Sequence, residues 1–307
     1  MTITQLEYLI AVAKNGSFTK ASERCNVTQP TLSMQVQNLE EELKIKIFIR
    51  GTKPIQLTEV GKKLIEQGQV IVKEAIKMRD IVSYEKNYIG GEFKLGIIPS
   101  ASSIISLFIN QFIKKYPNVN LKIEELNSAN LIRKVLSGDI DGGIISTPLN
   151  NEKIDEIPLY YEPFVAYIPI TNKLSKIKKL KVEDLEYSSI LILEEKNSFT
   201  KQVIKLIPNF NKKIGLNTKS FETLIQLSDR GFGITLLPLL YSKNFSKERL
   251  NSIKYFEEPE PAREMSIIFS KNKLKSPIIN ALSNSLEKAS RENIKTNKIK
   301  IISPMQD

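Results

Sequence analysis

Residues 26–43, NVTQPTLSMQVQNLEEEL, predict an amphipathic helix whose first turn is unusually polar. Thr28 is placed to cap this helix, and Pro30 falls in its first turn, where the missing backbone N–H costs nothing. Apolar residues recur four, three and four positions apart, which predicts one buried face. The residues of that face are Leu32, Val36, Leu39 and Leu43. The opposite face, at the N-terminal end, displays Gln29, Thr31, Ser33, Met34 and Gln35.

The neighbouring segments complete a recognisable motif. Residues 4–14 have helical spacing up to a stop at Asn15-Gly16, and Ser17 then caps a second short helix over residues 18–25. Two short helices joined by a tight break, here within NVTQP, form a helix-turn-helix unit. The segment that follows, residues 45–61, predicts two short strands around a Gly-Thr-Lys-Pro turn. Such a hairpin is a wing, and basic residues tip it at Arg50 and Lys53.

The polar turn has the composition of a DNA-reading surface. In helix-turn-helix units the N-terminal residues of the second helix reach base edges. A glutamine side chain can pair with adenine, whereas serine and threonine can bind either phosphates or bases. A basic wing contacts the DNA backbone or the minor groove. An isolated T-Q-P is more often only a helix cap, so the prediction depends on the whole ordered set. The predicted DNA contacts are Thr28, Gln29, Pro30, Thr31, Ser33, Gln35, Arg50 and Lys53.

Composition favours an anionic partner and disfavours most enzymes. The 307-residue chain has a formal net charge of +11, but residues 1–88 hold 13 Lys and Arg against 10 Asp and Glu, so charge does not locate the nucleic-acid site. With no His, one Cys and no glycine-rich phosphate loop, we predict no catalytic residues, no metal site and no cofactor. We find no membrane-spanning apolar run and no secretion signal, and therefore expect a cytoplasmic protein with no membrane partner.

A single long helix is predicted from Thr58 to about Asn87, because apolar residues recur every three, four or seven positions. A helix of that length, with no stop before Gly90-Gly91, more often pairs with its copy in a dimer than packs on its own chain. The first prediction for this segment is therefore a dimerising linker, and the alternative is a helix packed within its own subunit.

Beyond Gly91 strands alternate with helices, which predicts βαβ units and a parallel sheet. A second such block begins at YEPFVAYIPI, residues 161–170, and EMSIIFSKNK, residues 264–273, returns to the first. Two lobes joined by two crossings enclose a cleft, where ligands usually sit at the carboxyl ends of the strands. The predicted segments are 1–58 (winged helix-turn-helix), 59–89 (linker helix), 90–162 with 268–300 (first lobe), 163–267 (second lobe) and 301–307 (tail).

The signature GSFTKASERCNVTQPTLSMQVQNLEEELKIKIFIRGTKPIQLTEVG, residues 16–61, closely resembles that of the LysR-type transcriptional regulators. GITLLP at residues 233–238 and the Gly90-Gly91 hinge also fall where that family has them, so the resemblance covers nearly the whole chain. It implies an α+β multidomain fold: an N-terminal winged helix-turn-helix, a long linker helix and a two-lobed α/β effector domain like that of periplasmic binding proteins. It also implies a sequence-specific regulator of double-stranded promoter DNA, acting as a homodimer or homotetramer, with RNA polymerase as a candidate partner.

The same resemblance implies which residues meet the effector, expected to be a small polar or anionic molecule. The family's ligand contacts match Ser100 after the first strand and Ser128 at a helix start, and helix N-termini favour anionic or hydroxylated ligands. Each serine could instead simply cap its own helix. The predicted effector contacts are Ser100, Ser128, Ser198, Ser220, Gly231 and Gly233.

Within the family, segments such as EEKNSFTKQ (194–202) and PEPARE (259–264) resemble the peroxide-responsive branch. That branch senses oxidants with a cysteine where this chain has Ser198, and its second cysteine falls near Ile207. Serine forms neither a sulfenic acid nor a disulfide, and Cys25 belongs to the predicted core of the helix-turn-helix. The resemblance therefore implies descent from that branch without its thiol chemistry.

Two alternatives remain open on the sequence. An enzyme or a transport-type solute-binding protein would use the same two lobes, but the chain shows neither a catalytic motif nor a secretion signal. A constitutive DNA-binding regulator that has lost ligand or redox sensing is harder to separate from an inducible one, because Ser198 replaces the sensing thiol.

Overall fold

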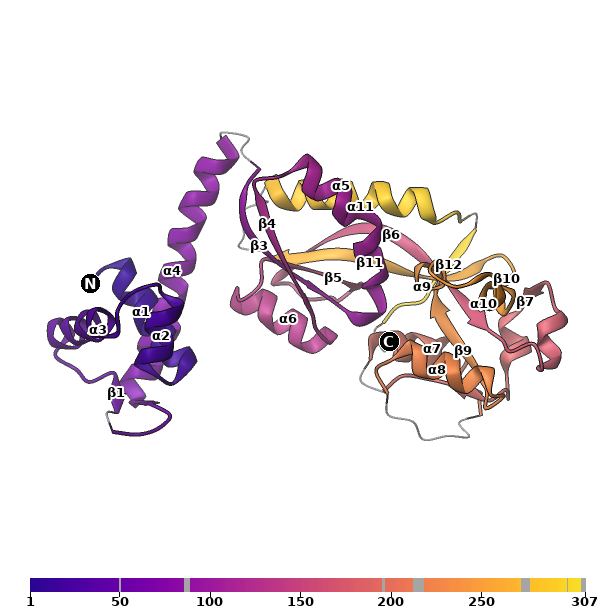
Figure 1. The fold of residues 1–307 in the computed structure, drawn as a ribbon, viewed down its shortest axis with the longest axis horizontal. Coiled ribbons are helices and arrows are strands. Elements are labelled where there is room, and N and C mark those ends of the chain that lie inside the picture. Colours follow the sequence, from indigo (N-terminus) through magenta and orange to yellow (C-terminus); the bar gives the residue numbers. More distant parts are fainter. Residues whose placement is uncertain are drawn as a thin grey trace. The chain divides into compact units, whose positions relative to one another are not determined.

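The computed structural model describes residues 1–49, 51–85, 89–194, 197–211, 218–271, 277–296 and 298–304. The chain divides into two compact units, Met1–Lys86 and Asn87–Asp307. Each unit is built around its own buried apolar residues, with one core in the first unit and two in the second. Figure 1 labels the helices and strands of both units.

The first unit is a helix-turn-helix with a two-stranded wing and a long final helix. As predicted, Ser17 and Thr28 cap the second and third helices by accepting hydrogen bonds from backbone N–H groups. The predicted apolar face is buried: Leu32, Val36 and Leu39 are fully inaccessible. The elements are α1 (Ile3–Asn15), α2 (Phe18–Arg24), α3 (Gln29–Leu43), β1 (Phe48–Ile49), β2 (Gln56–Leu57) and α4 (Glu59–Glu85).

A buried carboxylate fixes the start of the wing. Glu40, near the end of α3, is 2% exposed, and its Oε1 accepts hydrogen bonds from the backbone N–H groups of Ile47 (2.7 Å) and Phe48 (3.2 Å). Lys46 Nζ lies 3.8 Å from the other oxygen of the same carboxylate. The turn between α3 and β1 is therefore held by a side chain of the helix that precedes it.

Helix α4 contributes to the core of the first unit and also exposes apolar side chains along its length. Ile65 is buried among the core residues, and the helix packs against α1. Val60, Val70 and Met78 are 49%, 49% and 69% exposed. The predicted helix is confirmed over Glu59–Glu85, and its expected last residues lie outside the described part of the chain.

The second unit has two lobes that share long strands. The first lobe contains β3 (Gly91–Ile97), α5 (Ser103–Lys115), β4 (Val119–Glu125), α6 (Ser128–Ser137) and β5 (Gly142–Thr147), with the 3-10 turn η1 (Pro99–Ala101) after β3. The final helix, α11 (Pro277–Asn293), packs against α5. Both lie on one side of the sheet of this lobe, with α6 on the other (Figure 1).

Two antiparallel strands pass between the lobes. They are β6 (Ile154–Tyr167) and β11 (Glu260–Ser270), which pair along most of their length. Residues of β6 up to Tyr160 belong to the core of the first lobe, and residues from Phe164 belong to that of the second. The two predicted crossings are therefore one paired ribbon.

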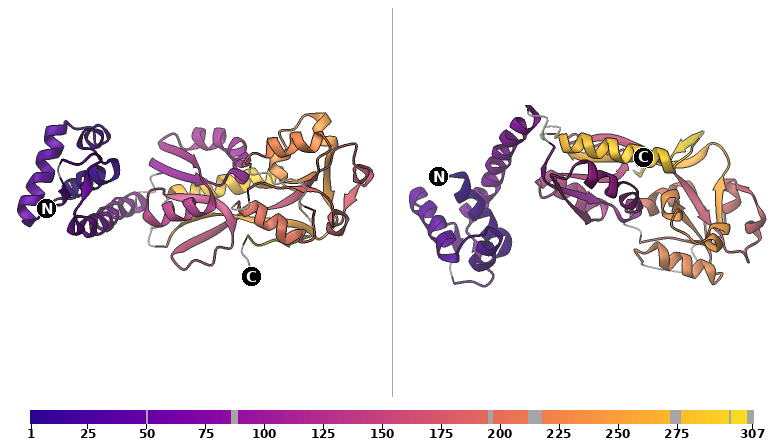
Figure 2. Two further views of the ribbon diagram at one scale, coloured as in Figure 1. Left: turned by 90° about the horizontal axis from the view of Figure 1, so that it is seen from below. Right: turned by 45° about the horizontal axis from the view of Figure 1, so that its top comes forward.

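The second lobe is built on the far half of this ribbon. Its strands are β7 (Lys179–Leu180), β8 (Ile190–Leu191), β9 (Ile234–Pro238) and β10 (Ile253–Phe256), and its main helices are α7 (Ser198–Leu206) and α8 (Phe221–Asp229). Shorter elements are η2 (Lys173–Lys176), η3 (Val182–Leu185), α9 (Leu239–Ser242) and α10 (Lys247–Asn251). Figure 2 shows this unit from two further directions, with α11 in yellow along the first lobe.

The structure differs from two sequence-based expectations. The sheet is mixed rather than parallel: β3 pairs parallel with β4 and β5, but β5 pairs antiparallel with β11, because the ribbon re-enters the lobe from the opposite direction. The expected tail at 301–307 is partly built into the fold. Strand β12 (Ile299–Ile301) pairs with β11, and Ile302 is buried in the second core.

Candidate functional site

The first turn of α3 presents the predicted DNA contacts. The hydroxyl of Thr28 lies 2.7 Å from that of Thr31 and also accepts a hydrogen bond from the backbone N–H of Thr31 at 3.4 Å. Thr28 is therefore both the cap of the helix and part of the displayed surface. Thr28, Gln29, Pro30 and Thr31 are exposed, whereas Ser33 and Gln35 are half-buried. On the wing Lys53 is exposed, and Arg50 lies outside the described residues.

Gln35 is oriented by a neighbour on the first helix. Its Oε1 accepts a hydrogen bond from Gln5 Nε2 at 3.3 Å, and Gln5 is only 8% exposed. Among the described residues, the Nε2 of Gln35 has no acceptor. The amide is thus held in place on one side with a donor remaining on the other, which suits a contact to a base edge.

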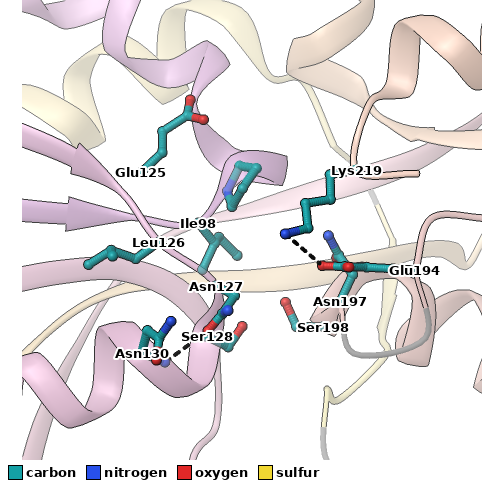
Figure 3. Close-up of a pocket in the computed structure, with 11 residues that line it drawn as sticks. Ile98, Glu125, Leu126, Asn127, Ser128, Asn130, Glu194, Asn197, Ser198 and Lys219 are labelled. Carbon is teal, nitrogen blue, oxygen red and sulfur yellow. Dashed lines mark hydrogen bonds and ion pairs between the residues drawn. The ribbon is translucent and has the colours of Figure 1, made fainter. Parts of the chain in front are cut away.

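A cavity of about 380 Å³ opens in the second unit, where chain segments leave the carboxyl ends of β3, β4 and β8 (Figure 3). Residues 98–99, 125–128 and Asn130 line it from the first lobe. The second lobe contributes Glu194, Asn197, Ser198 and Lys219. The position agrees with the general location of ligands in two-lobed α/β domains.

Two helices begin at the wall of this cavity, one from each lobe. Asn127 caps α6 by accepting the backbone N–H of Asn130 at 2.9 Å, and Asn197 caps α7 by accepting that of Phe199 at 2.9 Å. The serines that follow are therefore the first helical residues and not the caps. Within the described residues, the hydroxyls of Ser128 and Ser198 have no hydrogen-bond partner, and Figure 3 shows them on facing sides of the cavity.

Charged side chains stand beside these helix starts. Lys219 Nζ lies 4.0 Å from Glu194 Oε1 in the second lobe, and Glu125 lines the cavity from the first lobe. The Lys219 side chain is 75% exposed, whereas that of Glu194 is 21% exposed. In the described part of the chain, the cavity therefore combines the carboxylates of Glu125 and Glu194, the ammonium of Lys219 and two helix N-termini, whose free N–H groups favour negative charge.

A buried ion pair ties the two lobes together at the crossing strands. Arg263 on β11 and Glu162 on β6 are each 1% exposed, and Arg263 Nη2 lies 2.7 Å from Glu162 Oε2. The same guanidinium donates to the hydroxyl of Ser100 at 2.8 Å and to its backbone carbonyl at 2.6 Å. It also lies over the ring of Phe199, 5.2 Å from the centroid, and Leu240 N–H donates to Glu162.

Four of the predicted effector contacts do not line the cavity. Ser100 is 3% exposed because Arg263 holds it, and Ser220 caps α8 by accepting the backbone N–H of Thr223. Gly231 has a φ of +80°, which other residues rarely adopt. At Gly233 a Cβ atom would lie 2.6 Å from the carbonyl oxygen of Ser189. These four residues have structural tasks, whereas Ser128 and Ser198 reach the cavity.

Sequence reasoning missed the charged pair and the two capping asparagines. The dipeptide Asn-Ser at 127–128 and at 197–198 starts a helix each time, but the same dipeptide at 251–252 and 284–285 lies at the end and in the middle of a helix, so it does not by itself mark a cap. No local pattern marked Glu194 and Lys219, which lie 25 positions apart in the sequence. Among the described residues, no helix is long and apolar enough to cross a membrane. The same residues contain no group of His, Cys, Asp and Glu that could hold a metal ion.

Comparison with known proteins agrees with this architecture. Residues 3–62 match the bacterial regulatory helix-turn-helix protein, lysR family, and residues 86–291 match the LysR substrate binding domain. A full-length cysteine variant of OxyR from Pseudomonas aeruginosa is 29% identical, with a TM-score of 0.75 over 94% of this chain and 98% of that one. The DNA-binding transcriptional dual regulator OxyR of Escherichia coli is 26% identical over 88% of this chain and 89% of its own length.

A further solved structure, full-length BenM, has the same fold, with a TM-score of 0.59 and 22% identity over 97% of this chain and 99% of that one. The family matches account for both units described above. The chain belongs to the LysR family, and it is a DNA-binding transcriptional regulator with a substrate-binding domain. The matched families are transcription regulators and not enzyme families.

Proposed function

We propose that this regulator reads promoter DNA with the first turn of α3 and is switched by a small polar or anionic molecule in the cavity between its lobes. The observation that carries the proposal is the meeting of α6 and α7 at one cavity, each with a serine at its N-terminus whose hydroxyl has no hydrogen-bond partner in the described part of the chain. A ligand that bonds both helix starts favours a closed arrangement of the lobes, and only such differential binding can shift a conformational equilibrium.

We also propose that the chain works as a homodimer that pairs through α4, with a homotetramer as the larger assembly and RNA polymerase as a further partner. The exposed apolar residues Val60, Val70 and Met78 support pairing of this helix with its copy. Because the target is promoter DNA, we place its action in the cytoplasm. A relative named hydrogen peroxide-inducible genes activator is 27% identical over 274 residues, but Ser198 supports a ligand switch here rather than a thiol switch.

A constitutive regulator is the less favoured alternative. A domain that no longer binds a ligand has no reason to keep a polar cavity at the meeting point of two helix starts. The half-buried hydroxyls of Ser128 and Ser198, unpaired among the described residues, support a ligand that pairs them.

The test is a Ser128→Ala variant of the full chain, compared with Ser106→Ala on the exposed side of α5. Native mass spectrometry and thermal unfolding with a panel of small carboxylates and polyols would identify a stabilising ligand. A gel shift with that ligand then measures the change in DNA affinity. We expect Ser128→Ala to weaken the ligand response while DNA binding without ligand stays intact. An unchanged response in Ser128→Ala would remove the support for the cavity as the effector site.

A further inference from the structure

The charges in the cavity do not suit a simple anion. Among the residues that the structure describes, Glu125 and Glu194 line it together with the ammonium of Lys219, although the protein as a whole carries a net charge of +11. Glu194 is the more enclosed of the two, with a side chain 21% exposed. A ligand that carried only negative charge would have to approach this carboxylate, and repulsion between like charges grows where water is displaced.

The pair of Glu194 and Lys219 is held in place by the backbone of the second lobe. Glu194 N–H donates to the carbonyl of Thr218 at 2.9 Å, so the segments that bear the two side chains lie side by side. The carbonyl of Glu194 in turn accepts the N–H of Asn197, the cap of α7, at 3.0 Å. The ammonium, the carboxylate and the helix start therefore form one preset group.

Within this group the ion pair is loose. At 4.0 Å, Lys219 Nζ and Glu194 Oε1 are beyond hydrogen-bond distance, and the lysine is 75% exposed. Each partner thus retains hydrogen-bonding capacity for a ligand. Figure 3 shows the two charged ends beside Ser198 and across from Ser128. A molecule that lies in this space meets Glu194, Lys219 and the start of α7 on the side of the second lobe, and the start of α6 on the side of the first.

We propose that the effector is a small zwitterion with both a carboxylate and an ammonium group, of the class of α-amino acids and short peptides. This inference rests on the proposed function of the cavity as an effector site. The ligand carboxylate binds Lys219 and the free N–H groups and hydroxyls at the starts of α6 and α7. The ligand ammonium binds Glu194, and the ligand thereby separates the loose ion pair into two closer ones.

The experiment measures binding to the full-length protein by calorimetry. The probes are the standard L-α-amino acids, each compared with its N-acetyl derivative, which lacks the ammonium, and its primary amide, which lacks the carboxylate. We expect at least one amino acid to bind, with both derivatives weaker by about tenfold or more. Simple monocarboxylates and dicarboxylates form a separate panel.

Variants assign the two ends of the ligand. Glu194→Gln should weaken the amino acid about tenfold and leave its N-acetyl derivative unchanged or tighter, while Lys219→Gln should weaken both. Glu248→Gln and Lys243→Gln, both exposed and outside the cavity, serve as matched controls with unchanged binding. Circular dichroism and specific DNA binding verify that each variant is folded.

The outcomes separate this inference from the proposed function. One outcome is that simple carboxylates bind as tightly as amino acids, through Ser128 and without any need for an ammonium group on the ligand. In that case the effector is not a zwitterion, but the cavity remains the effector site. If no amino acid binds but a simple carboxylate does, the conclusion is the same. If neither panel binds and no ligand copurifies with the protein, both the inference and the proposed function are overturned.

Discussion

The proposed DNA-reading turn, Thr28 to Gln35, and the proposed effector cavity are both built on helix N-termini, but they are assembled in different ways. The reading turn takes its polar groups from eight consecutive residues of one segment, Thr28 to Gln35, above an apolar face that packs on its own unit. The cavity takes its groups from separate segments in two lobes, and each helix start there is capped by its own asparagine. One surface is local in sequence, and the other exists only when the lobes meet.

This difference determines where each site is vulnerable. A substitution in the reading turn removes one contact and leaves the rest of the helix supported by Leu32, Val36 and Leu39. The cavity depends on groups that do not line it, because Arg263 bonds Ser100 of the first lobe and lies over the ring of Phe199 of the second, and these two residues follow the lining residues Pro99 and Ser198. Changes distant from the ligand are therefore expected to disturb the cavity more than the reading turn.

The largest effect is expected from Arg263→Met. The change leaves Glu162 as an unpaired buried charge and should lower the free energy of unfolding of the second unit by about 3–5 kcal/mol. Urea denaturation followed by circular dichroism measures it. Arg291→Met removes an ion pair from an 81% exposed side chain and should cost less than about 1 kcal/mol. Similar losses in the two variants would contradict the role given to the buried pair.

A companion double variant, Arg263→Met with Glu162→Leu, removes both charges together. It should recover much of the lost stability, since the isolated charge is the main cost. Its ligand response should remain impaired, because Ser100 and Phe199 have lost the guanidinium that joins them. DNA binding without ligand provides the internal control, as the first unit is unchanged.

In the first unit the corresponding buried carboxylate is Glu40. Glu40→Ala leaves the backbone N–H groups of Ile47 and Phe48 without their acceptor and should cost about 1–3 kcal/mol of stability. Thermal unfolding compared with Glu41→Ala, an exposed neighbour, measures the difference. A loss no greater than that of Glu41→Ala would show that the wing is held by other contacts.

Gln35→Ala tests the reading turn itself. Specific DNA binding should weaken by about 1–3 kcal/mol, with discrimination relaxed at one base pair and non-specific binding unchanged. Fluorescence anisotropy with a duplex selected from a random-sequence pool measures both. Gln37→Ala, which removes an exposed side chain bonded to Glu41, is the matched control. If Gln35→Ala binds the selected duplex as tightly as the parent protein does, Gln35 is not a base contact and other residues read the sequence.

The smallest effect is expected from hydrogen peroxide. Burial, reinforced by Glu7, raises the pKa of the Cys25 thiol, so the reactive thiolate is scarcer at neutral pH than in a free cysteine. Treatment with peroxide should therefore leave operator affinity unchanged, and Cys25→Ser should behave in the same way. If peroxide changes the DNA affinity of the parent protein in a gel shift, and Cys25→Ser does not show this change, Cys25 would be a thiol switch.

Much of the fold was predictable because it is encoded locally. The ends of α1 to α3 were predicted to within about one residue. The prediction used capping residues, the break at NVTQP and the 3.6-residue apolar spacing, and these local signals agree with one another. The mixed sheet was not predicted, because strand direction depends on where the ribbon re-enters the lobe. The burial of Ile302 likewise depends on pairing with β11, which its own sequence does not reveal.

By itself, the sequence determined the family, the capped helices and the polar turn of α3, because each depends on residues within a few positions of one another. Only the tertiary structure decided which serines reach the cavity, that Arg263 and Glu162 pair at the crossing strands, and that Glu194 faces Lys219. Hydrogen bonds and charge pairs act over a few ångströms in space, and partners far apart along the chain become neighbours only after the lobes have packed.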